Sequence, residues 1–126
     1  MQNKYFVNEF YGLCKHVAFD LSDTAQQLSA AQRTLSDTGK ENSGLEALFI
    51  TVESTNGGNT KDGLRFTIDG TTPTNGANPV GHLISVGQTI KITGKENIKR
   101  LKMLNGSNSS ANPSRVQISI QFESFE

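Results

Sequence analysis

The stretch that decides the fold lies near the C-terminus and reads Val116-Gln117-Ile118-Ser119-Ile120-Gln121-Phe122-Glu123. Apolar and polar residues alternate strictly through it, and a period of two places all four apolar side chains on one face of a β-strand. The stretch therefore predicts an amphipathic strand with one face in a core. We also expect this terminal strand to offer a free edge to which a partner strand can add.

The same alternation returns upstream at intervals of about ten residues, which is the spacing of a sandwich or barrel of short strands. Leu45–Glu53 has apolar residues on both faces and is expected to be the central strand. Gly87-Gln88 predicts a two-residue hairpin turn between the strands on either side of it. The predicted strands are 17–21, 45–53, 64–69, 82–86, 89–93, 98–104 and 116–123. The fold class that they indicate is all-β, as a single β-sandwich resembling a jelly roll.

Two segments fit this scheme less simply. In residues 24–35 the spacing of Leu28, Ala31 and Leu35 predicts one short helix, which Gly39 would close. Residues 1–16 carry four of the nine aromatic side chains without a regular period, and they are expected to form an extended N-terminal arm or, alternatively, the first strand of the core. The expected division is thus an arm over residues 1–16 and a sandwich domain over residues 17–126.

Composition limits the range of functions. Gly, Asn, Ser and Thr make up 47 of the 126 residues, and the formal net charge is zero. The neutral total argues against a dedicated nucleic-acid-binding protein. No transmembrane helix is expected, because the longest strictly apolar run is Ala47–Ile50, and the first residues lack the apolar core of a cleaved signal peptide. A single cysteine excludes an internal disulfide and multi-cysteine zinc sites.

No motif indicates catalysis. Cys14 and His16 would share a face of a strand, but a half-buried thiol beside a packed imidazole explains that spacing better than a nucleophile and its base. The aspartates at 20, 23, 37, 62 and 69 lack the spacing of a calcium loop and are interpreted as caps and turn residues. We therefore expect a protein that is not an enzyme, with no catalytic, cofactor-binding or metal-binding residues.

The candidate contacts with partners are of two kinds. The aromatic residues of the arm are Tyr5, Phe6, Phe10 and Tyr11. The basic run includes Lys99, Arg100 and Lys102, which on a strand would point to both faces; its charges would solvate an edge or, alternatively, contact an acidic protein surface. Nucleic acid is not expected, because no aromatic residue is interleaved to stack on bases. Glycan binding stays open as an alternative, although the chain has no Trp.

A family resemblance adds to this reading. Five segments, which span about residues 45–123, resemble small β-sandwich structural proteins in the virions of tailed bacteriophages: Ala47-Leu-Phe-Ile50, Leu64-Arg-Phe-Thr-Ile-Asp-Gly-Thr-Thr-Pro-Thr74, Gly81-His-Leu-Ile84, Gly87-Gln-Thr-Ile90 and Val116-Gln-Ile-Ser-Ile120. Phe19-Asp-Leu-Ser-Asp-Thr-Ala-Gln-Gln-Leu28 resembles the opening segment of that family, which would make residues 20–28 extended rather than helical.

The resemblance implies a virion component without enzymatic activity. The capsid decoration or cement protein is the first expectation, and a head–tail or tail-associated component is the alternative. A host-surface glycan-binding module is an alternative of a different class. The implied partners are the major capsid protein or other virion proteins, with homo-oligomerisation, and the implied location is the virion assembled in the bacterial cytoplasm.

Overall fold

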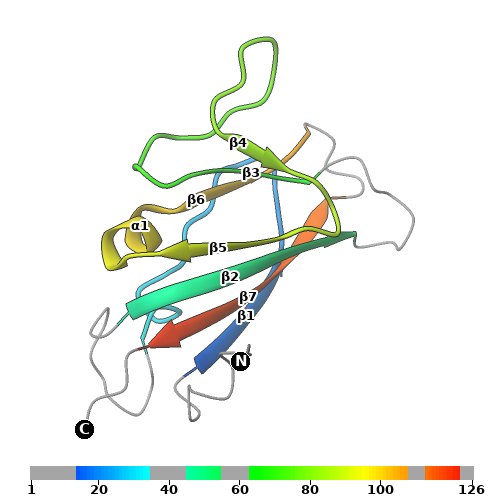
Figure 1. The fold of residues 1–126 in the computed structure, drawn as a ribbon. Coiled ribbons are helices and arrows are strands. Elements are labelled where there is room, and N and C mark those ends of the chain that lie inside the picture. Colours follow the sequence, from blue (N-terminus) through cyan, green and yellow to red (C-terminus); the bar gives the residue numbers. More distant parts are fainter. Residues whose placement is uncertain (1–13, 35–44, 55–62, 108–112, 123–126) are drawn as a thin grey trace, which may run out of the picture.

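The computed structural model describes residues 14–34, 45–54, 63–107 and 113–122, which form seven strands and one short helix (Figure 1). The all-β class predicted from the sequence is confirmed, with two antiparallel sheets. In chain order the elements are β1 (Cys14–Asp20), β2 (Leu45–Ser54), β3 (Leu64–Thr67), β4 (His82–Ile84), β5 (Thr89–Thr93), α1 (Lys95–Arg100), β6 (Lys102–Asn105) and β7 (Ser114–Phe122). A jelly roll has eight strands, so that finer topology stays a prediction.

The two sheets differ in width. One has four strands in the order β1-β7-β2-β5, and the other has three in the order β4-β3-β6. The expectation of a free edge on the C-terminal strand is wrong, because β7 pairs with β1 on one side and with β2 on the other. Among the described residues, the edge strands are β1 and β5 in the wide sheet and β4 and β6 in the narrow one.

The alternating residues of β7 form the centre of the core. Ile118 lies opposite Val17 on β1 and Ile50 on β2, and it is fully buried. β2 lies inside the sheet as predicted, with Leu48, Ile50 and Val52 facing the core. The narrow sheet adds Leu64, Ile84 and Met103 to the same cluster. One core therefore lies between the two sheets.

The segment after β1 is not the helix that the sequence predicted. Among the described residues of the predicted helix (24–34), Gln26 forms a two-way bridge with Met103, with N–H···O distances of 2.7 and 2.8 Å, and residues 30–33 form a turn. The backbone thus runs extended along the outer side of β6, and Leu21 and Leu28 are both buried. Pairing with β6 outweighs a weak local helix propensity, so the helical spacing misled the prediction.

The helix of this chain lies where the sequence predicted a strand. α1 covers Lys95–Arg100, so the predicted strand over residues 98–104 is wrong up to Arg100. Ile98 and Leu101 are both buried, and their i, i+3 spacing suits a helical turn. Gly94 precedes the helix with a φ of 94°, a conformation that favours glycine. Asn97 donates to the carbonyl of Thr93 at 3.0 Å, which fixes the start of the turn.

The predicted hairpin at Gly87-Gln88 is also wrong in its pairing. The turn exists, with a φ of 95° at Gly87 and a bond of 3.2 Å from the Gln88 N–H to the Ser85 carbonyl. However, β4 pairs with β3 and β5 pairs with β2, so the turn carries the chain from the narrow sheet to the wide one. The residue pattern encodes the turn but not the direction in which the chain leaves it.

The boundary expected at residue 17 falls inside a strand. β1 begins at Cys14, and residues 14–16 pair with β7 in register. The rest of the expected arm, residues 1–13, lies outside the described part of the chain.

Candidate functional site

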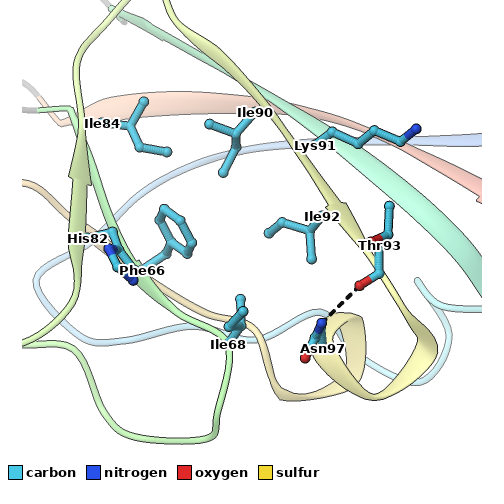
Figure 2. Close-up of a pocket in the computed structure, with 9 residues that line it drawn as sticks. All are labelled: Phe66, Ile68, His82, Ile84, Ile90, Lys91, Ile92, Thr93 and Asn97. Atoms are coloured by element: carbon cyan, nitrogen blue, oxygen red, sulfur yellow. Dashed lines mark hydrogen bonds between the residues drawn. The ribbon is translucent and has the colours of Figure 1, made fainter.

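An apolar cleft of about 480 Å³ opens on the side of the molecule where the narrow sheet ends at β4 and the wide sheet ends at β5 (Figure 2). Phe66, Ile68 and Ile84 line it from the side of the narrow sheet, and Ile90 and Ile92 line it from β5. The turn at residues 85–88 joins the two walls. The cleft is therefore the lateral opening of the shared core.

Burial shows how far the opening reaches. Ile84 and Ile92 are buried, whereas Phe66, Ile68 and Ile90 are only half-buried although they pack against the core cluster. Apolar side chains that stay half-exposed gain free energy if another group covers them, at about 25 cal/mol for each Å² removed from water. The cleft thus has the properties of a surface that binds an apolar partner.

Polar groups are sparse inside the cleft. The imidazole of His82 lies against the ring of Phe66, with the ring centroids 5.3 Å apart, and His82 is exposed at the rim. The Lys91 ammonium is directed away from the cleft in Figure 2 and lies 5.5 Å from the Phe49 ring centroid. The Asn97 amide already bonds to Thr93. This lining favours apolar contact over the recognition of a charged ligand.

β4 is unusual among the four edge strands. Its sequence, His-Leu-Ile, contains no Lys, Arg, Asp or Glu, whereas β1, β5 and β6 carry Lys15, Lys91 and Lys102. Charged residues on an edge strand discourage pairing with other chains. The outer side of β6 is in addition covered by residues 22–26, which bond to Met103 and Asn105. Within the described ranges, β4 is thus the edge strand that carries no charged side chain.

The two large apolar residues that are most exposed in the described part of the chain are on or next to β4. Leu83 is 54% exposed and Val80 is 41% exposed. Leu83 points to the opposite side of β4 from His82 and Ile84, because side chains alternate along a strand. The edge of β4 thus has the cleft on one face and the exposed Leu83 on the other, and we call this region the β4 edge site (Val80, His82, Leu83, Ile84 and the cleft).

The connection between β3 and β4 holds this site in place. Arg65 on β3 donates from Nε to Asn75 Oδ1 at 2.8 Å and from a terminal nitrogen to the Gly81 carbonyl at 3.0 Å. Thr74 and Val80 exchange two backbone hydrogen bonds of 3.0 Å. These bonds fix the residues just before β4, so the exposed Val80 and Leu83 are presented by an ordered backbone.

The basic residues predicted as partner contacts are placed differently from the expectation. Lys99 and Arg100 lie in the last turn of α1 and not on two faces of a strand. The side-chain nitrogens of Lys99 and Arg100 lie 3.9 and 3.8 Å from the carboxylate of Glu96. These ion pairs are exposed and contribute little to stability. Lys102 begins β6 and contacts the Thr72 hydroxyl at 3.5 Å. The structure therefore does not gather the three basic residues with the cleft.

The aromatic residues predicted as partner contacts lie outside the described part of the chain; they are Tyr5, Phe6, Phe10 and Tyr11.

Cys14 and His16 do not have the arrangement of a nucleophile and its base. Both are exposed on β1, and the His16 ring nitrogens bond to Gln117 at 2.7 Å and to Ser119 at 3.4 Å on β7. Desolvation by partial burial raises the pKa of the Cys14 thiol. A raised pKa lowers the thiolate fraction at neutral pH, which is opposite to the activation of a catalytic cysteine.

Two aspartates in the described ranges make structural contacts. Asp69 Oδ1 accepts the backbone N–H of Thr71 at 3.0 Å, and this bond lowers the pKa of Asp69. Asp20 pairs with Arg115 at 2.8 Å across β1 and β7. No group of three or more His, Cys, Asp or Glu side chains that could hold a metal ion occurs within the described ranges. None of the helices there has the length and apolar character needed to cross a membrane.

Comparisons with known proteins give no relative: no protein-family model, curated protein or solved structure matches the chain. The β4 edge site therefore rests on the structure itself. Sequence reasoning missed it, and the one available signal was the uncharged run His82–Val86 between two glycines. The hairpin predicted at Gly87-Gln88 pairs that run with residues 89–93, so the sequence does not reveal an edge there.

Proposed function

We propose that this protein is a non-enzymatic structural protein of a tailed-bacteriophage virion that works by binding neighbouring protein subunits, most simply as a decoration or cement protein on the capsid. The observation that carries the binding role is the β4 edge site, where an uncharged edge strand lies beside an apolar cleft. The virion context is supported by the resemblance of residues 45–123 to virion β-sandwich proteins.

The site suits an extended protein segment as its ligand. A strand added beside β4 would gain backbone hydrogen bonds along the edge, and every second side chain would enter the cleft. Four isoleucines and one phenylalanine line the cleft, and such an apolar surface is covered well by apolar side chains of another protein. One such contact is small, but a decoration protein repeats it at symmetric positions over the shell, and the resulting avidity exceeds the affinity of one site.

The test is the copy number of the protein in purified virions of the phage that encodes it, measured by quantitative mass spectrometry against the major capsid protein. Hundreds of copies for each particle are the expected result for a decoration protein. A few tens of copies or fewer would replace this role with a head–tail or tail-associated one. Absence from the particle would refute the virion proposal and leave the alternative of a host-surface glycan-binding module.

A further inference from the structure

We propose that the first partner of the β4 edge site is a second copy of this chain, with β4 of each copy pairing antiparallel across a two-fold axis. The two narrow sheets then continue into one sheet, and the open sides of the two molecules face each other. The inference rests on the proposed function, because it names the partner of the same site.

The absence of charge on β4 favours self-association. Two copies of one strand that pair about a two-fold axis bring identical residues close together, and like charges at opposite positions destabilise a pair of strands. Lys91 on β5 would meet its own copy in this way, whereas His-Leu-Ile carries no Lys, Arg, Asp or Glu. Of the two strands that border the cleft, β4 is therefore the one compatible with a second copy of itself.

The pairing has a defined register. With three residues in the strand, a symmetric antiparallel pair places Leu83 opposite Leu83 of the partner subunit and His82 opposite Ile84 of the partner subunit. Leu83 is the most exposed of the large apolar residues in the described ranges, at 54%. On the axis it would pack against its own copy and lose much of that exposure.

The cleft is the second reason to expect that β4 pairs with β4 of another copy. The inward-facing Ile90 and Ile92 of β5 line the opening beside β4 (Figure 2). A strand added beside β4 extends the narrow sheet over that opening. The inward-facing side chains of the added strand, His82 and Ile84 of the partner subunit, would face the half-buried Ile90 on β5.

The dimer is expected to be weak in solution. A ladder of three residues with two adjoining clefts is smaller than the interfaces of stable dimers, which bury about 1,600 Å² in total. The expected state is therefore a monomer–dimer equilibrium that shifts with concentration, and the repeated positions of a virion would supply the remaining affinity.

The first experiment is sedimentation velocity of the full chain over a wide range of protein concentrations, compared with Leu83→Lys and with Ser119→Lys. Leu83→Lys places two cations at the axis, and we expect it to stay monomeric at every concentration. Ser119→Lys adds the same charge at an exposed position on β7 in the other sheet, and it should associate as the unmodified chain does. A monomeric unmodified chain, or a dimer that persists in Leu83→Lys, would overturn the inference.

The second experiment tests the register. Directly opposite residues of an antiparallel pair have Cα atoms about 4.5–5.5 Å apart, within the range that a disulfide spans. In a Cys14→Ser background, Leu83→Cys should therefore form a covalent dimer on mild oxidation, and Ser119→Cys should not. Equal yields from both variants would contradict the two-fold pairing at β4.

These outcomes separate the inference from the proposed function. A chain that is abundant in virions but monomeric in solution would refute self-pairing and leave the decoration role intact. A chain that dimerises through Leu83 but is absent from virions would confirm the pairing and refute the virion role.

Discussion

The difference between the closed centre of the core and its open side predicts unequal effects of the same substitution at two isoleucines. Ile118 is fully buried between Val17 and Ile50, so Ile118→Ala removes buried methyl groups and leaves a cavity that the flanking strands prevent from collapsing. We expect a loss of about 3 kcal/mol in the free energy of unfolding. Ile90 is half-buried at the cleft, where solvent fills the vacated space, so Ile90→Ala should cost about 1 kcal/mol.

The assay is equilibrium unfolding in urea, followed by far-UV circular dichroism in a Leu83→Lys background that suppresses self-association. With a urea dependence of about 2 kcal/mol per M, Ile118→Ala should lower the midpoint by about 1.5 M and Ile90→Ala by about 0.5 M. Ile118→Val, with a loss of about 1 kcal/mol, provides a milder variant if Ile118→Ala does not fold. Equal losses at Ile118 and Ile90 would refute the reasoning, because they would show that the cleft is filled in the monomer.

Three further predictions concern the backbone, a buried amide and pH. Gly63→Ala should strongly lower the free energy of unfolding, because an added Cβ would lie 2.3 Å from the carbonyl oxygen of Ile84. Gly70 also has a positive φ, but an added Cβ there would meet nothing within 4 Å. Gly70→Ala should therefore lower the free energy of unfolding in urea by only about 1 kcal/mol. Asn105→Ala should cost about 2 kcal/mol by the same assay, since the Ser114 N–H loses its acceptor at 2.9 Å, and a neutral result would contradict that role. Because the pKa of Asp69 is lowered in the folded state, its carboxylate contributes stability above the ordinary aspartate pKa, and this contribution is lost as pH falls through the folded pKa. Asp69→Ala should therefore lose less stability than the unmodified chain when the pH is lowered. An unchanged dependence of stability on acid pH would refute this.

Much of the wide sheet was predictable from the sequence, because its strands carry their burial in their own pattern. Val116, Ile118, Ile120 and Phe122 alternate with polar residues, and all four are buried. The double-sided pattern of residues 45–53 likewise predicted an interior strand, which β2 is. In both cases the period of two is a local property, so no knowledge of the neighbours was needed.

The errors share one cause, which is that pairing partners are not encoded locally. The residues around Gln26 have a helical spacing, but their backbone pairs with Met103 some 77 positions later. Lys95–Arg100 forms a helix because Ile98 and Leu101 both have a core to enter on that side. The turn at Gly87 is visible in the sequence, whereas its exit toward β2 instead of β4 is not.

The sequence by itself therefore determined the all-β class, the main strands of the core and the near absence of motifs with a known chemistry. The tertiary structure decided which strands form edges, and with them the candidate site. An edge is defined by the neighbour that a strand lacks, and the cleft lies between the strands β4 and β5, which are edges of the two sheets. Burial patterns report which face of a strand meets the core, but only the assembled sheets show where that core is left open.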